Sequence, residues 1–210
     1  MGLMIVKKKL RIETMDCHFT ATAFVIDIRK EKPQRTLFLW HKRLQRWMPP
    51  GGHMEPNELP EETAKRECEE ETGLDVDIIG DAQANVFVNT ENEGRMLKKP
   101  FTMLLENIPA SEERGETAHQ HMDFVFLARP INIDQVLNMN EHEAEEMKWF
   151  TKQDIENLPA REIYDNVRMY ALEIFTLQSY MLFTSNTSIS GHAKSRARAS
   201  DSPTPRVMAS

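Results

Sequence analysis

The stretch GGHMEPNELPEETAKRECEEETGL, residues 51–74, concentrates negative charge in a short segment. It holds eight glutamates but only one lysine and one arginine. The sequence from about Pro60 to Thr72 predicts a helix, which Gly73 should end in the left-handed conformation that glycine adopts readily. Like charges four residues apart on a helix repel each other, so folding this segment costs free energy. That cost indicates that the carboxylates serve a function.

The predicted helix has two different faces. Glu67, Glu70 and Glu71 stand at positions i, i+3 and i+4 and therefore share one face. Ala64 and Cys68 share another face, which is small, apolar and suited to packing on a sheet. Three carboxylates this close do not all ionise readily without a compensating cation, and an all-oxygen ligand set suits a hard divalent ion such as Mg²⁺ or Mn²⁺. Helix geometry alone leaves one alternative, a solvated acidic face.

The residues around these glutamates follow a known pattern. From Gly52 the chain runs through five residues to Glu58, and through seven more to RECEEETGL, residues 66–74. This order resembles the complete Nudix box, G-x5-E-x7-R-E-U-x-E-E-x-G-U, in which U is a bulky apolar residue. Cys68 is the weakest match to this pattern, because it is smaller than the usual leucine or isoleucine. The likeness covers roughly residues 18–160 and implies an α/β fold, a Nudix-type α/β/α sandwich with a mixed β-sheet.

The resemblance also implies a reaction. Nudix proteins hydrolyse a diphosphate linkage in a nucleoside diphosphate joined to another group, with Mg²⁺ or Mn²⁺ as cofactor. By position, Glu67, Glu70 and Glu71 would be the metal-binding carboxylates, and either Glu67 or Glu70 would accept the proton of the attacking water. Arg66 would pair with Glu58 and orient the catalytic glutamates. The glycines of the segment would serve the backbone geometry at the two ends of the helix: Gly51, Gly52 and Gly73.

Two other functions are compatible with the same fold. One is a nucleotide-diphosphate sensor without turnover, but such relatives typically lose box glutamates that this chain retains. The other is an enzyme that resembles the isopentenyl-diphosphate isomerases. It would need a catalytic cysteine, and neither Cys17 nor Cys68 is well placed in the sequence for that role. The family's sequence markers for ADP-ribose and dinucleoside polyphosphate substrates do not occur after the box, so the leaving group stays open.

Further site residues are expected outside the box. Nudix proteins often add a carboxylate from a later loop, and five glutamates are available for that role: Glu116, Glu141, Glu143, Glu145 and Glu146. His119, His121 and Asp123 alternate along a predicted strand and so share a face. These three residues could contact substrate, hold a transition metal, or form an ordinary hydrogen-bonded strand face. We predict substrate contacts for His119 and His121.

A basic segment after the box offers a second candidate contact with substrate. Arg95, Lys98 and Lys99 could clamp a phosphate or belong to an exposed basic loop. We predict the phosphate contact for Arg95. Three aromatic side chains could stack on a base, although aromatic residues in strands more often belong to the core: Trp40, Trp47 and Phe87.

Alternating and β-branched residues predict strands on both sides of the acidic helix. The predicted strands are residues 19–28, 35–42, 101–108, 119–128 and 147–150, with a rigid extended loop at 47–52. Residues 161–183 predict a second long helix with one apolar stripe, formed by Ile163, Val167, Tyr170, Ile174, Leu177 and Met181. The stripe either covers the sheet or forms the seam of a homodimer.

Composition limits the partners of the chain. With 40% hydrophobic and 28% charged residues, it is ordinary for a soluble globular protein and has no apolar run long enough for a membrane span. A net charge of −7 disfavours broad nucleic-acid binding. Two cysteines are too few for a disulfide framework, and no signal peptide is evident, so we expect a cytoplasmic protein that binds a small nucleoside diphosphate derivative.

The 210 residues divide into three predicted parts. Residues 1–17 are an N-terminal extension, and residues 18–183 form the Nudix domain, which includes the helix 161–183. From residue 184 to 210 the composition changes to serine, alanine and arginine without apolar periodicity, which is typical of a disordered tail.

Overall fold

The computed structural model describes residues 15–27, 29, 34–80, 94 and 96–177. Its strands are β1 Cys17–Asp27, β2 Arg35–His41, β3 Arg46–Met48, β4 Gly51–His53, β5 Val76–Ile79, β6 Thr102–Ile108, β7 His119–Pro130 and β8 Ala144–Thr151. Its helices are α1 Pro60–Thr72, the short 3-10 helix η1 Glu112–Arg114 and α2 Lys152–Asn157, and residues 165–177 are helical as well. The tail 184–210, Arg95, Phe87, Met181 and most of the N-terminal extension lie outside the described residues.

β1 and β7 form the centre of a mixed eight-stranded sheet. They run parallel, in a register that pairs Thr20 with Asp123. The other paired strands that the structure describes are antiparallel: β4 and β2 pair with β1, β5 and β6 pair with β7, and β3 and β8 pair with β2. The expected mixed sheet is confirmed.

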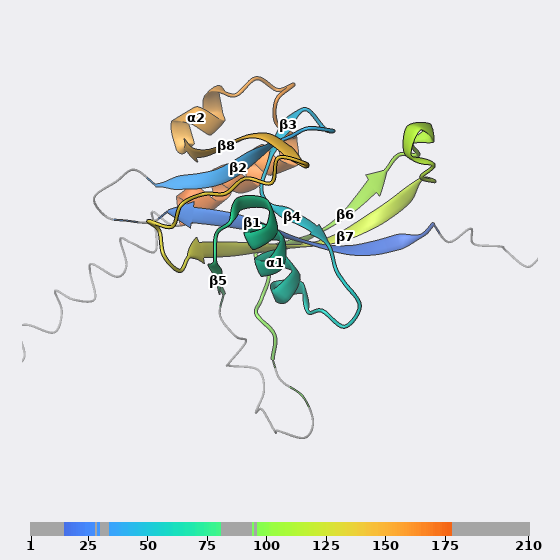
Figure 1. Ribbon diagram of the computed structural model, residues 1–210, viewed down its shortest axis with the longest axis horizontal. Coiled ribbons are helices and arrows are strands. Elements are labelled where there is room, and N and C mark those ends of the chain that lie inside the picture. The colour runs from blue at the N-terminus through green and yellow to red at the C-terminus, as the bar shows by residue number, and fades with distance from the viewer. Residues whose placement is uncertain (1–14, 28, 30–33, 81–93, 95, 178–210) are drawn as a thin grey trace, which may run out of the picture.

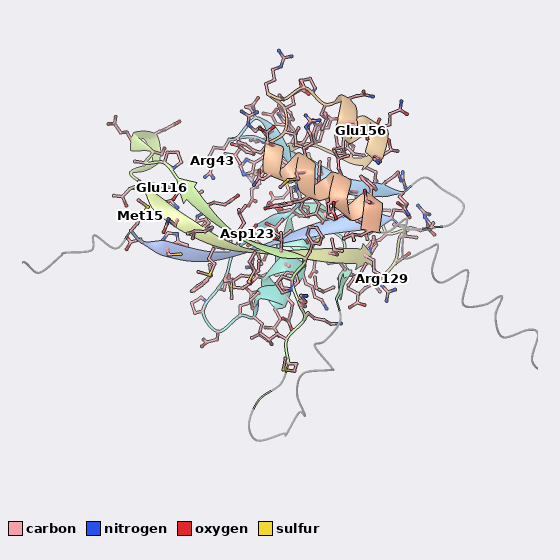
Figure 2. All side chains as sticks on the ribbon, turned by 180° about the vertical axis from the view of Figure 1, so that it is seen from behind. Met15, Arg43, Glu116, Asp123, Arg129 and Glu156 are labelled. Carbon is pink, nitrogen blue, oxygen red and sulfur yellow. The ribbon has the colours of Figure 1, made fainter. Side chains whose placement is uncertain are left out.

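Helices cover both faces of this sheet, as Figures 1 and 2 show from opposite sides. On one face, Ala64 and Cys68 of α1 are fully buried in a cluster with Ala21 of β1. On the other face, Val167 from the helix 165–177 lies in a cluster with Phe24 of β1. Alternate residues of β1 therefore serve two separate cores, and the predicted α/β/α sandwich is confirmed.

Most predicted strands are confirmed to within two residues at each end, and three elements differ more clearly. The helix predicted at 161–183 begins at residue 165, because the carbonyl of Glu162 accepts a hydrogen bond from Trp47 of β3 and its N–H bonds back to Pro159 in a turn. The predicted loop 47–52 is extended, but its two ends belong to the strands β3 and β4 on either side of Pro49 and Pro50. The strand predicted at 147–150 is longer, since β8 extends over Ala144–Thr151.

The apolar stripe of the last helix covers the sheet over its described length. Ile163, Val167 and Ile174 are at most 5% exposed and belong to one core cluster with strand residues. These residues are buried inside the domain, where they cover the sheet as the first interpretation expects. They are therefore not a dimer seam. Trp47 is 3% exposed in the same cluster and is likewise a core residue. Among the described residues, the helices are all too short or too polar to cross a membrane.

Candidate functional site

Local sequence fixes both ends of α1. Pro60 occupies the first helical position, where the missing N–H of proline costs nothing. The N–H of Leu59 donates to the Glu62 carboxylate at 3.0 Å. At the other end, Gly73 has a φ of 71° and its N–H donates to the carbonyl of Glu69. The helix therefore has the predicted bounds, and it lies next to β4, which precedes it in the chain (Figure 1).

Arg66 uses all five N–H groups of its guanidinium. Two of them donate to the two carboxylate oxygens of Glu58, at 2.8 and 3.0 Å. Nη1 donates to Glu67 at 2.8 Å and to Glu70 at 3.0 Å, and Nη2 also donates to the carbonyl of His53 at 2.9 Å. The bonds from Arg66 are the main reason why the pKa of Glu58 falls to about 2. The expected pair of Arg66 and Glu58 is present, and it ties α1 to the preceding loop.

Two glycines of β4 lie against the carboxylates of α1. The N–H of Gly51 donates to Glu71 at 3.0 Å. A Cβ atom at Gly52 would lie 2.4 Å from Oε1 of Glu67, so only glycine leaves room for that carboxylate. Exposure increases along the acidic face, from 7% for Glu71 to 57% for the side chain of Glu70.

A later loop brings a fourth carboxylate to α1. The N–H groups of Asn138 and Asn140 donate to the carbonyls of Thr72 and Glu71, at 2.8 and 3.0 Å. These bonds satisfy carbonyls in the last turn of the helix, which have no partner within the helix itself. The loop thereby positions Glu143, whose carboxyl group is hydrogen-bonded to that of Glu71. Of the five glutamates proposed for this role, Glu143 is the one that the structure joins to the acidic face.

Other candidates from the sequence lie elsewhere. Glu146 pairs with Lys148 at 3.3 Å on β8, and Glu116 lies at the tip of the hairpin formed by β6 and β7 (Figure 2). Lys98 donates to the carbonyl of Gly80 at 3.4 Å.

Neither cysteine belongs to the acidic face. Cys68 is fully buried on the packing side of α1, and burial raises the pKa of its thiol to about 12. Cys17 is exposed at the start of β1. A buried thiol that resists ionisation is a poor nucleophile, so Cys68 does not serve isomerase chemistry.

The carboxylates of the acidic face disfavour one another's ionised forms. Burial, followed by the hydrogen bond with Glu143, raises the pKa of Glu71 to about 9. Burial also raises the pKa of Glu67, and the charges of Glu70 and Glu143 add to this effect although Arg66 opposes it. A hard divalent cation would supply the positive charge that this set of oxygen donors favours. The side chains that could hold Mg²⁺ or Mn²⁺ are Glu67, Glu70, Glu71 and Glu143.

β7 brings His119 and His121 together but separates Asp123 from them. The Nε2 atoms of His119 and His121 are 3.1 Å apart. Asp123 accepts hydrogen bonds from the hydroxyl groups of Thr20 and Thr22 on β1, at 3.1 and 3.0 Å. The hypothesis of a ligand set made of His119, His121 and Asp123 is therefore wrong in its third member, because threonines of β1 occupy that carboxylate.

Two histidines that the sequence did not single out complete this cluster. His18 of β1 lies opposite His121 in the parallel register, and its ring is 4.7 Å from that of His119. His53 of β4 has its ring 4.8 Å from that of His121. Burial and the neighbouring imidazoles lower the pKa of His53, and they lower the pKa of His121 to about 4. The pairing of β1 with both β7 and β4, which no local pattern specifies, assembles these rings.

Comparison with known families bears directly on the acidic face. The sequence model of the NUDIX domain matches residues 18–171, which include the whole box, the loop with Glu143 and the start of the last helix. The chain belongs to the NUDIX family.

Similar proteins agree with this membership. A NUDIX family hydrolase from Clostridium perfringens has a crystal structure that matches 76% of this chain and 97% of its own, with a TM-score of 0.61 and 29% identity. A probable DHNTP pyrophosphohydrolase from Lactococcus lactis is 32% identical over 130 residues, which are 62% of this chain and 59% of that protein. The chain thus spans about three fifths of the length of this curated relative.

One further solved structure supports the fold of the NUDIX domain. The MutT protein from Methanosarcina mazei matches 79% of this chain and 96% of its own, with a TM-score of 0.51 and 17% identity. At that identity the likeness concerns the fold, and it agrees with the sandwich described above.

Proposed function

We propose that this NUDIX protein hydrolyses a diphosphate linkage in a nucleoside diphosphate joined to another group, and that it uses Mg²⁺ or Mn²⁺. The arrangement of α1 supports this proposal: Arg66 holds Glu67 and Glu70, while Glu143 is joined to Glu71. The four carboxylates form an all-oxygen donor set, the kind of ligand that suits a hard divalent cation. The name of the L. lactis relative, a pyrophosphohydrolase, points to the same class of reaction.

The residues of the site would divide the work among them. When bound, a divalent cation supplies positive charge that neutralises diphosphate oxygens and makes a water more acidic. Glu67, Glu70 and Glu71 would hold the cation, with Glu143 as a further ligand. Either Glu67 or Glu70 would accept the proton of the attacking water. Arg66 would act as a positioning residue, because it bonds to both of these carboxylates.

A substrate panel tests the reaction class. The panel contains DHNTP, suggested by the name of the relative, together with ADP-ribose, dinucleoside polyphosphates, NADH, nucleotide sugars and (d)NTPs. Each compound is incubated with Mg²⁺ and, separately, with excess EDTA. We expect hydrolysis of at least one compound with Mg²⁺ and none in EDTA. Turnover in EDTA at the Mg²⁺ rate would contradict metal dependence, and tight binding without turnover would favour the sensor function.

Glu70→Gln separates the chemistry of the acidic face from its folding. The side chain is 57% exposed, and an amide oxygen can still accept the hydrogen bond from Arg66. The metal-free melting temperature should be unchanged or slightly higher, because repulsion between the glutamates is relieved. The kcat should fall at least ~100-fold, equivalent to about 3 kcal/mol.

Glu69→Gln is the matched control for this variant. Glu69 is exposed and precedes Glu70, so the same charge is removed one position away from the site. Its kcat should stay within about 3-fold of wild type, as for other surface changes. If Glu70→Gln kept normal turnover, or unfolded the metal-free protein, the acidic face would be structural.

The remaining parts of the proposal rest mainly on the sequence. They are phosphate contact by Arg95, substrate contact by His119 and His121, a cytoplasmic location without broad nucleic-acid binding, and a homodimer as the alternative to a monomer.

A further inference from the structure

Three histidines on β1 and β7 direct ring nitrogens toward one another. One ligand atom each from His18, His119 and His121 lies within 4.8 Å of the other two. Alternation along both strands puts these side chains on the sheet face opposite α1, because Ala21 of β1 and Phe126 of β7 pack on the α1 side. The imidazole cluster and α1 therefore lie on opposite faces of the sheet.

The hydrogen bonds of His119 prepare its Nε2 atom to act as a ligand. Nδ1 of His119 lies 2.9 Å from the carbonyl of Thr117, and a carbonyl can only accept, so Nδ1 carries the proton. In the neutral ring, the lone pair is then on Nε2, which faces Nε2 of His121. A backbone carbonyl that fixes the outer nitrogen of a histidine is a usual companion of metal ligation.

The spacing of the nitrogens fits one bound ion. Two imidazole nitrogens, each at about 2.0–2.1 Å from a tetrahedral Zn²⁺, lie roughly 3.3–3.4 Å apart. The observed separation of 3.1 Å between His119 and His121 needs only a small adjustment. His18 is exposed, so a rotation of its side chain can bring in the third nitrogen.

We propose that His18, His119 and His121 form a binding site for a borderline transition-metal ion of the Zn²⁺ class. Imidazole ligands suit Zn²⁺, Ni²⁺ and Cu²⁺, whereas the carboxylates of the acidic face suit Mg²⁺ and Mn²⁺. The two sites therefore select different ions, and the histidine site does not depend on the proposed hydrolase function. An ion bound there joins the start of β7 to the start of β1, whose register pairs His121 with His18.

Calorimetric titration with Zn²⁺ tests this site in the full-length chain. The protein carries no affinity tag, is first stripped with EDTA, and is then titrated in a large excess of Mg²⁺ that competes for the acidic face. We expect one equivalent of Zn²⁺ to bind with a Kd below about 10 µM, and the bound ion to raise the melting temperature. Co²⁺ in place of Zn²⁺ should give the visible absorption of a nitrogen-bound ion.

Variants assign the binding to the three histidines. His121→Ala and His18→Ala should each weaken Zn²⁺ binding at least about 100-fold. This is more than expected for the loss of a residue that only bonds to a metal ligand. Gln120→Ala is the matched control, since Gln120 lies between two of the ligands but on the opposite face of β7. His18 is exposed, so its variant remains informative if His121→Ala folds poorly.

Two results would overturn the proposal. One is wild-type protein that binds no Zn²⁺ at about 10 µM in the presence of Mg²⁺. The other is binding at a different site, shown either by binding that survives both histidine variants or by binding that Glu70→Gln abolishes.

Discussion

At the scale of single residues, one guanidinium determines where three carboxylates lie. Arg66 bonds to Glu58, Glu67 and Glu70 at once, and its last N–H reaches the carbonyl of His53. The planar fork of arginine matches this geometry, whereas the single ammonium of lysine does not. The same charge on a lysine would therefore leave several of these acceptors without a donor.

Arg66→Lys should accordingly be destabilising. We expect the free energy of unfolding of the metal-free protein to fall by about 1–3 kcal/mol, measured by urea denaturation, with a parallel loss of kcat. Lys65→Arg is the control: the Lys65 side chain is 45% exposed, it approaches Asp77 at 3.9 Å, and the change should stay within about 0.5 kcal/mol. Equal stability of Arg66→Lys and wild type would mean that the five bonds do not position the site.

Two neighbouring glycines should respond differently to alanine. At Gly52 the new Cβ meets the flexible end of Glu67, so the domain should fold while Mn²⁺ affinity falls about 10-fold or more. At Gly51 it meets the backbone of β1, 2.7 Å from the carbonyl oxygen of Ala21, so stability should fall by about 1–3 kcal/mol or more. Urea denaturation and Mn²⁺ calorimetry separate the two effects. A Gly51→Ala protein as stable as wild type would contradict this account.

At the scale of elements, the junction of β1 with β2 carries a buried ion pair. Asp27 is 1% exposed and lies 2.7 Å from both Arg29 and Arg35. Burial alone would raise the pKa of Asp27, but the hydrogen bonds from the two arginines outweigh it and lower the pKa to about 2. Because this is below the ordinary value of 3.8, the ionised form stabilises the folded state.

The free energy of unfolding should depend on pH in a way that reveals the contribution of this ion pair. Its contribution, about 2 kcal/mol, is fully present above roughly pH 5 and is lost as the pH falls from about 4 to about 2. The difference in unfolding free energy between wild type and Asp27→Asn should therefore shrink over that range. Asp77→Asn, at a 45% exposed aspartate, should differ from wild type by less than about 0.5 kcal/mol. A difference for Asp27→Asn that stayed constant from pH 5 to 2 would refute the ion pair's role.

Elements defined by local signals were predictable from the sequence, and contacts between distant strands were not. The bounds of α1 follow from Pro60 and Gly73, and the strands β6 and β7 follow from their alternation. Glu143 could be proposed only as one of five glutamates, because its place depends on a loop that bonds to the end of α1. His18 was not predicted at all, since its neighbours come from a strand about a hundred positions away.

At the scale of the whole molecule, the last described helix completes one of the two cores. Val167, Ala171, Ile174 and Phe175 are buried there with residues of β1 and β2. Truncation after Phe183, which removes residues 184–210, should leave the melting temperature within about 2 °C and turnover intact. Truncation after Tyr164 is the contrasting variant and should abolish cooperative unfolding, because the lost side chains of Val167, Ile174 and Phe175 each contribute roughly 1.5–3 kcal/mol. A large fall in the melting temperature of the protein truncated after Phe183 would place residues beyond 183 in the core.

The parallel pairing of β1 with β7 also has a consequence for the order of folding. Thr20 and Asp123, which bond across this pair, are 103 positions apart, and closing a loop of that length costs about 4 kcal/mol of chain entropy. β1 and α1 leave the ribosome long before β7 is made. Until then, one edge of β1 has no partner strand, and both cores lack the buried side chains that β7 contributes. The acidic face can therefore form early, but the domain closes only after β7 has been made, and we expect slow refolding for a domain with this long-range pairing.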